Sequence, residues 1–223
     1  MPNWTICLGE INVLKPYRFS LEAVIRRLSR ENNVVTFHFV TYAPSEADSD
    51  ELDPAEVKPY ELIPVPASYF HKNRLSNLVQ EHCDSAEKVL GIASNVLVRK
   101  NNIVVPRHIV QLDIDGVWPD LERPALTYDD MPSVIAHAAA GLCNQSGCIV
   151  ISSKDASFQN FHFYGKKVVT HQEWGALMRK SQASIHVDSA WPEYSLARGY
   201  SVLRVSANKD KPSLPVPIGH LVT

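Results

Sequence analysis

The stretch IVQLDIDGVW, residues 109–118, places two carboxylates, Asp113 and Asp115, inside an apolar run. In a β-strand successive side chains alternate between the two faces, so these carboxylates would project from the same face. Two like charges at this spacing repel each other unless a cation lies between them. Because carboxylate oxygens are preferred ligands of Mg²⁺ and Mn²⁺, the stretch predicts a strand that presents a divalent metal site.

The composition of the chain predicts an ordinary globular protein with one core. It has 223 residues, of which 45% are hydrophobic and 21% are charged. The 22 Lys and Arg residues nearly balance the 24 Asp and Glu residues, which gives a net charge of −2. This balance provides no global attraction to nucleic acid or to an anionic membrane, so a phosphate-binding surface would have to be local.

Targeting and cysteine patterns predict an intracellular, cytoplasmic protein. No apolar run approaches the roughly 20 residues of a membrane span, and the beginning MPNWTICLGEI lacks a basic flank followed by an apolar core. Only one pair of cysteines is close in sequence, too few for a zinc site, so buried thiols are expected. The cysteines are Cys7, Cys83, Cys143 and Cys148.

The first hundred residues predict a mixture of helices and strands. Apolar residues at helical spacing indicate a helix in 18–32 with Ser20 as its N-cap, and alternation indicates a strand over 34–43. The acidic segment 45–56 is expected to be an exposed loop. Residues 73–97 are interpreted as one or two helices.

The second half continues the pattern after the opening stretch. The expected elements are a helix over 131–142 capped by Asp129 or Asp130, strands over 147–153 and 160–167 that form a hairpin around 154–157, a turn at Gly165, a helix over 170–181 with a capping box of Thr170 and Glu173, and strands over 184–188 and 200–206. Strands interleaved with helices and hairpins predict an α+β (mixed α/β) fold with helices on one face of the sheet.

Three polar features follow one another along the second half of the sequence. They are the pair Asp113 and Asp115, then Ser152 and Ser153 ahead of His162 across the hairpin, and then Asp188 at the end of IHVD. A third carboxylate would complete a metal site that neutralises a triphosphate, and the histidine could hydrogen-bond to phosphate oxygens.

The order of these features resembles the three motifs of the archaeo-eukaryotic primase superfamily, which includes the primase-polymerases of plasmids and viruses. The segment RGYSVLRVSANKDKP, residues 198–212, is similar to the Arg-rich strand that many members carry after their last Asp. The resemblance implies a single catalytic domain over 1–223. Within it, an RRM-like metal-site module over 105–223 would follow an N-terminal α/β module over 1–104.

The resemblance also implies roles for individual residues. Asp113, Asp115 and Asp188 would be catalytic ligands of two Mg²⁺ or Mn²⁺ ions. Ser153 or Ser152, together with His162, Arg204, Lys209 and Lys211, would bind the nucleotide. The sequence departs from the family at residue 160, which is Asn where many members have Ser, so Ser153 on the neighbouring strand is expected to take that place.

The implied reaction is template-directed nucleotidyl transfer during replication of a plasmid, virus or similar element. The implied partners are nucleoside triphosphates, a single-stranded DNA template, and a helicase or another replication protein. No membrane partner is expected.

Alternatives for the opening stretch remain open at this point. Asp-x-Asp-Gly also matches the first motif of haloacid-dehalogenase-like phosphatases, although about 110 residues precede it here and no Gly-Asp-x-x-x-Asp follows. Asp115 and Gly116 could instead form a hairpin turn. The chain could also be a non-catalytic nucleic-acid-binding module. His186, two residues before Asp188, is a rival metal ligand or a partner of one.

Overall fold

The computed structural model describes residues 20–43, 57–72, 74–83, 87–117, 131–154, 159–184, 187, 190–207 and 214–220. The elements in chain order are α1 (Leu21–Asn32), β1 (Val34–Tyr42), β2 (Ile63–Pro66), the 3₁₀ helix η2 (Ala67–Lys72), α3 (Leu75–His82), β3 (Val89–Lys100), β4 (Ile103–Val117), α4 (Met131–Cys143), β5 (Gly147–Lys154), β6 (Gln159–Val169), α5 (His171–Ser181), α6 (Ala190–Arg198), β7 (Val202–Arg204) and β8 (Val216–His220). The mixture of helix and strand confirms the expected α+β class.

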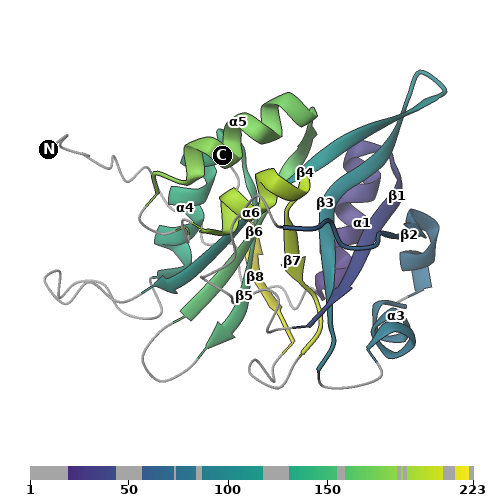
Figure 1. The fold of residues 1–223 in the computed structure, drawn as a ribbon, viewed down its shortest axis with the longest axis horizontal. Coiled ribbons are helices and arrows are strands. Elements are labelled where there is room, and N and C mark those ends of the chain that lie inside the picture. Colours follow the sequence, from purple (N-terminus) through teal and green to yellow (C-terminus); the bar gives the residue numbers. More distant parts are fainter. Residues whose placement is uncertain are drawn as a thin grey trace, which may run out of the picture.

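One antiparallel sheet of eight strands organises the molecule (Figure 1). Seven strands follow the order β2-β1-β3-β4-β6-β5-β8, and β7 pairs with β3. The same side of β3 is shared by two partners, because residues 91–93 pair with β7 and residues 95–100 pair with β4. The pairing of β4 with β3 ends at His108, and from this residue onward β4 pairs with β6 on its other edge. The short strand β7 therefore occupies the place beside β3 that β4 leaves.

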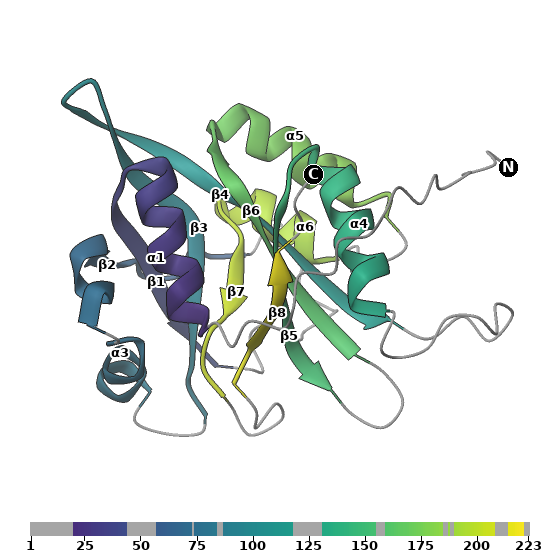
Figure 2. The ribbon, with the colours of Figure 1, turned by 180° about the vertical axis from the view of Figure 1, so that it is seen from behind.

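Helices cover both faces of this sheet, which corrects the expectation of helices on one face. On β6, Phe163 packs with Trp174 of α5 and with residues of α4. The next residue, Tyr164, lies in a different cluster that includes Ile25 of α1. Since neighbouring residues of a strand point to opposite faces, α4 and α5 lie on one side and α1 on the other. Figures 1 and 2 show α1 from opposite sides of the molecule.

Helix α1 begins and ends as its sequence predicts. The Ser20 side chain accepts a hydrogen bond from the Ala23 amide at the N-terminus, which confirms the expected cap. The helix ends at Asn33, whose φ of 54° is left-handed, a conformation that Asn tolerates better than most residues. Strand β1 starts at the next residue, so helix and strand form a tight αβ unit.

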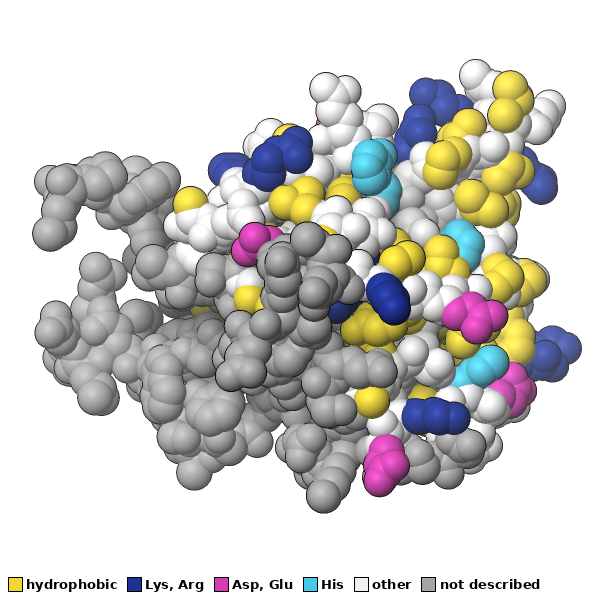
Figure 3. Space-filling view, in the orientation of Figure 1, with side chains coloured by type: hydrophobic (Ala, Val, Ile, Leu, Met, Phe, Trp, Pro, Cys, Tyr) yellow, Lys and Arg dark blue, Asp and Glu magenta, His cyan; other side chains and the backbone are white. Residues whose placement is uncertain are grey.

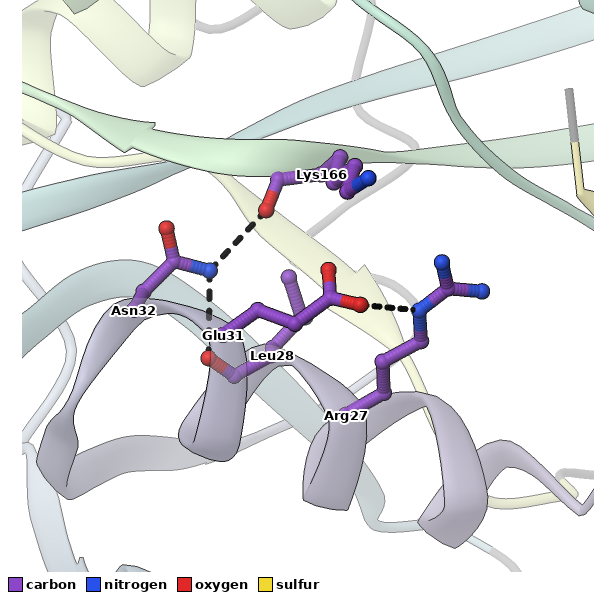
Figure 4. A network of polar contacts seen from close by, with 5 residues as sticks. All are labelled: Arg27, Leu28, Glu31, Asn32 and Lys166. Carbon is purple, nitrogen blue, oxygen red and sulfur yellow. Dashed lines mark hydrogen bonds and ion pairs between the residues drawn. The ribbon is translucent and has the colours of Figure 1, made fainter. Parts of the chain in front are cut away.

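A single side chain ties the end of α1 to strand β6 (Figure 4). The Asn32 amide nitrogen donates to the Lys166 carbonyl at 2.9 Å, and its oxygen accepts from the Val168 amide at 3.1 Å. Asn32 thus bonds to the backbone of β6 as a neighbouring strand would. On the exposed side of the same helix, Arg27 and Glu31 form an ion pair at 2.7 Å.

The expected elements of the second half are largely confirmed. Helix α4 spans the predicted segment, β5 and β6 pair as the predicted hairpin, and β7 lies in the predicted last strand. Helix α5 begins with the predicted capping box, in which Thr170 and Glu173 bond to each other's backbone amides. The sequence did not predict α6 or β8.

The interpretation of residues 73–97 as helical is wrong for its second half. Helix α3 ends at His82, and β3 begins at Val89. The small residues Gly91, Ala93 and Ser94 of this segment are all buried in the centre of the sheet. Burial between β1 on one side and β7 and β4 on the other decides the conformation there, because strand preference depends more on context than on the residue.

The predicted turn at Gly165 is wrong, and so is the alternative of a turn at Asp115 and Gly116. Strand β6 continues through Gly165, where an added Cβ would lie 2.8 Å from Val110 Cβ and 2.9 Å from the Gln145 side chain. The glycine therefore marks a close approach of neighbouring chain segments rather than a turn. Strand β4 likewise runs through Asp115 and Gly116, which removes the alternative of a hairpin turn there.

Several expected features lie in segments that the structure does not describe. The segment 45–56, Cys7 and most of the expected strand over 184–188 lie outside the described residues. The division at 104/105 stays a prediction, although β4 crosses that point. In the described part of the chain, Cys143 and Cys148 are free thiols, and no helix has the length and apolar character needed to cross a membrane.

Candidate functional site

Asp113 and His162 face each other at the centre of the sheet. They are directly paired residues of β4 and β6, and His162 Nε2 lies 3.5 Å from Asp113 Oδ1. The Asp113 side chain is 22% exposed, whereas that of His162 is 4% exposed. The pair therefore lies at the boundary between the interior and the solvent, where a carboxylate can both keep a partner and reach a ligand.

The alternation of the two strands explains this placement. Leu112 and Ile114 are buried in the cluster that α4 and α5 cover, as are Phe161 and Phe163 on β6. The residues between them must project from the other face, as the period of two requires. The hydrophobic pattern of both strands thus fixes which side Asp113 and His162 occupy.

The serines of β5 lie near this pair but not directly opposite the histidine. Val150 is the residue of β5 that pairs with His162, and Ser153 pairs with Asn160, two residues earlier on β6. A bulge lies between Ile151 and Ser153. Cross-strand partners share a face, so Ser153 occupies a register position diagonal to His162.

Arg204 places a buried positive charge in the same region. The residue is 6% exposed, and its side chain extends from β7 and donates hydrogen bonds to the carbonyl oxygens of Ser152 and Ser206. Burial lowers the pKa of Arg204, and the negative charge of Asp113 is among the nearby groups that oppose this shift. The guanidinium therefore joins β7 to β5 and lies close enough to Asp113 for the two charges to interact.

Two further polar groups in this region are buried without a hydrogen bond. The hydroxyl groups of Tyr164 and Ser152 have no partner among the residues that the structure describes. Burial raises the pKa of Tyr164 well above its ordinary value, with additional contributions from nearby groups that include Asp113. Tyr164 was not identified from the sequence, but its position two residues after His162 on one strand places both on the same face.

A chain of polar contacts begins beside the carboxylate and leads toward α5. Gln111, two residues before Asp113, accepts a hydrogen bond from the Ser201 hydroxyl at 2.9 Å. The links that follow are Ser201 N to Ser94 Oγ (3.0 Å), Ser94 Oγ to His108 Nδ1 (3.1 Å) and His108 Nε2 to His171 Nδ1 (3.1 Å). These contacts connect Gln111, on the face of Asp113, with His108 and His171 beside α5, which covers the opposite face of the sheet.

The structure brings together only part of the predicted site. It places Asp113, His162, Arg204 and the backbone of Ser152 in one region. Asp115 and Ser153 lie on β4 and β5, but their side chains are outside the described part, as are Asp188, His186, Lys209 and Lys211. No cluster of three or more His, Cys, Asp or Glu side chains suited to a metal occurs within the described ranges. The roles of all these residues remain predictions.

A family comparison connects this geometry to known proteins. The family described as archaeo-eukaryotic primase 1D-like matches residues 125–216. The matched range contains His162 and Arg204 and begins after Asp113 and Asp115. No curated protein matches the sequence. The family match confirms the resemblance that the order of the motifs predicts: residues 125–216 are similar to a primase-type domain of the archaeo-eukaryotic primase superfamily.

Proposed function

We propose that this chain catalyses metal-dependent, template-directed nucleotidyl transfer in the replication of a plasmid, virus or similar element. The observation that carries the proposal is the pairing of Asp113 with His162 across β4 and β6. These residues come from two separate motifs of the predicted order. The family match over 125–216 supports the same class of domain.

The donor set suits a hard divalent cation. Asp113 supplies a carboxylate at the edge of the interior, and Asp115 lies two residues further along the same strand. Asp188 would supply the third carboxylate. Carboxylate oxygens favour Mg²⁺ or Mn²⁺ over the softer metals that cysteine-rich sites select. When bound, two such ions would neutralise the triphosphate and lower the pKa of the attacking 3′-hydroxyl.

In the proposed reaction, the primer 3′-hydroxyl loses its proton to solvent and its oxygen attacks the α-phosphorus of the incoming nucleoside triphosphate. The bond from the α-phosphorus to the bridging oxygen breaks, and pyrophosphate leaves. His162 would orient the Asp113 carboxylate through Nε2 and provide a donor toward the triphosphate. Lys209, Lys211 and the Ser153 hydroxyl would hold phosphate oxygens, and the template would be single-stranded DNA.

Arg204 has a different setting from the other proposed phosphate ligands. Its guanidinium is buried and bonded to two backbone carbonyls, so two of its donors are already used. A fixed positive charge beside Asp113 would reduce repulsion among the three carboxylates before any cation arrives. We therefore assign Arg204 a positioning role in addition to its predicted contribution to phosphate binding.

The test is nucleotide incorporation on a primed single strand with Mg²⁺ or Mn²⁺. Asp113→Asn and Asp188→Asn keep the side-chain shape and remove one charge each, so both should abolish incorporation while the protein stays folded. His162→Gln should reduce the rate about 10- to 100-fold, the usual effect of changing the partner of a metal ligand. Glu81→Gln, on an exposed residue of α3, is the matched control and should leave the rate unchanged.

Other outcomes would identify the alternatives. A folded protein that binds Mn²⁺ but incorporates no nucleotide with either ion would contradict the proposal. Hydrolysis of a small phosphoester that requires Asp113 but not Asp188 would instead indicate a phosphatase. Salt-sensitive DNA binding with no activity, unchanged by all three carboxylate variants, would indicate a non-catalytic nucleic-acid-binding module.

A further inference from the structure

The hairpin formed by β3 and β4 projects beyond the rest of the sheet (Figures 1 and 2). Lys100 pairs with Ile103, and the turn between them consists of Asn101 and Asn102, whose φ angles of 50° and 64° are left-handed. Two left-handed residues in succession are typical of the type I′ turn that closes tight hairpins. The two-residue turn thus fixes the register of the hairpin up to its last pair.

The end of this hairpin has no neighbouring strand on either side within the described residues. Strand β1 pairs with β3 only as far as Val98, and β6 pairs with β4 only from His108 onward. Val98 and Val105 near the base still pack in or against the hydrophobic core. We call residues 99–107 the hairpin tip; they form a two-stranded ribbon.

The hairpin tip combines exposed apolar and basic side chains. Ile103 is 64% exposed and Val104 is 47% exposed, two of the four large hydrophobic residues that the structure describes as exposed. Arg99 and Lys100 are exposed on the facing strand, Arg107 is partly exposed, and the segment contains no acidic residue. Figure 3 shows hydrophobic and basic side chains together on this projection, at the upper right.

We propose that the hairpin tip binds double-stranded nucleic acid, with Ile103 and Val104 in a groove and the basic residues on phosphates. A two-stranded ribbon fits the major groove, and apolar side chains of ribbons are also used as wedges in the minor groove. The three positive charges at 99, 100 and 107 complement a phosphate backbone. A single strand is a poorer match, because the tip has no aromatic side chain on which bases could stack.

The inference goes beyond the proposed reaction, since duplex binding requires none of the carboxylates. The two sites are nevertheless connected by one strand. Ten residues of β4 separate Ile103 from Asp113, which corresponds to roughly 33 Å at the usual rise of a strand. A duplex that lay along β4 would present about ten base pairs over this length. The tip could therefore hold product duplex about one helical turn from the site of synthesis.

The test is fluorescence anisotropy of the full chain with a 20-base-pair DNA duplex and with a 20-nucleotide single strand. The variant Ile103→Ser with Val104→Ser should weaken duplex binding about tenfold, the loss expected when aliphatic burial is removed, without changing the salt dependence. Arg99→Ala with Lys100→Ala should reduce the slope of log affinity against log salt by about 2. Single-strand affinity should be unaffected by the serine variant.

Two matched controls accompany these variants. Leu214→Ser with Val216→Ser removes the other two exposed hydrophobic residues, and Lys72→Ala with Arg179→Ala removes two exposed charges elsewhere. Neither should change duplex affinity as the tip variants do. All the exchanged side chains are exposed, so thermal unfolding should confirm that each variant is folded.

Duplex affinity equal to that of the wild type in the Ile103 and Val104 variant would overturn the inference. The inference would also be overturned if this variant lost self-association in sedimentation experiments while its duplex affinity stayed unchanged. The tip would then bind protein and not nucleic acid. Asp113→Asn separates this inference from the proposed reaction. It should keep full duplex affinity while losing incorporation, so either idea can fail while the other stands.

Discussion

The buried imidazole of His108 should make the stability of the protein depend on pH. Its ring is stacked on Trp174 with 4.7 Å between ring centroids, and its two nitrogens contact Ser94 and His171. Burial, and next the charge of His171, lower the pKa of His108 from 6.5 to about 4. The ring therefore stays neutral in the folded protein at pH values where the unfolded chain binds a proton.

The sign and size of the effect follow from this difference. Between pH 6.5 and 4 the unfolded chain holds the extra proton, so acidification favours unfolding. The contribution of the neutral His108 ring to the free energy of unfolding is complete above pH 6.5 and is lost as the pH falls to about 4. A pKa of about 4 against the ordinary 6.5 corresponds to about 3 kcal/mol of unfolding free energy.

Urea unfolding at several pH values between 7.5 and 4 measures this quantity. Carboxylates also titrate in this range, so the informative number is the difference between the wild type and a variant. His108→Gln should lose about 3 kcal/mol less than the wild type on acidification. His171→Ala removes the second cause and leaves the stacking of His108 on Trp174 in place, so it should show a smaller difference in the same direction. The control His71→Gln changes an exposed residue and should behave as the wild type. An equal loss in wild type and His108→Gln would refute the reasoning.

Two further pairs of variants test the packing of β5, β6 and α1. Gly147→Ala should destabilise the protein by about 1–3 kcal/mol in urea unfolding, because an added Cβ would lie 2.4 Å from the Phe163 ring. Gly141→Ala, in α4 with nothing within 4 Å, should instead stabilise it by about 0.5–1 kcal/mol; equal effects would contradict this assignment. Asn32→Ala should cost about 2 kcal/mol, since it removes two hydrogen bonds to β6. Arg27→Ala breaks only an exposed ion pair and should cost under about 0.5 kcal/mol, and a similar cost for both would show that the tie to β6 contributes little.

Capping and alternation patterns predicted the elements correctly where the stabilising contacts are made by residues close in sequence. The capping side chains Ser20 and Thr170 mark their helices because the hydrogen bonds they make are formed within one turn. The alternation of β-branched and aromatic residues in 34–42 likewise identifies β1, since it matches a half-buried strand.

Tertiary contacts decided the places where the prediction failed. Strand β3 has small residues at its centre, and the reason appears only when β7 lies beside it. An added Cβ on Gly91 would be 2.4 Å from the Val202 side chain. Gly165 is a similar case, where a close neighbour and not a turn requires the glycine. Neither neighbour is close in sequence, so a local pattern could not identify it.

The candidate site was predictable as a set of residues but not as an arrangement. The sequence identified Asp113 and His162 by their order along the chain. It did not predict that β6 lies between β4 and β5, which is what makes the two residues direct partners. The buried setting of Arg204 was also not predictable, since its hydrogen-bond acceptors are backbone carbonyls that any residue could provide.

The most direct test of the proposed function is a crystal structure of the protein with Mn²⁺ and a non-hydrolysable nucleoside triphosphate. The anomalous signal of Mn²⁺ would locate the ions without reference to the protein atoms. We predict a Mn²⁺ ion bound by carboxylate oxygens of Asp113, Asp115 and Asp188, with the triphosphate beside His162. A structure in which Mn²⁺ binds elsewhere, or in which Asp188 lies away from the Asp113 carboxylate, would contradict the proposal.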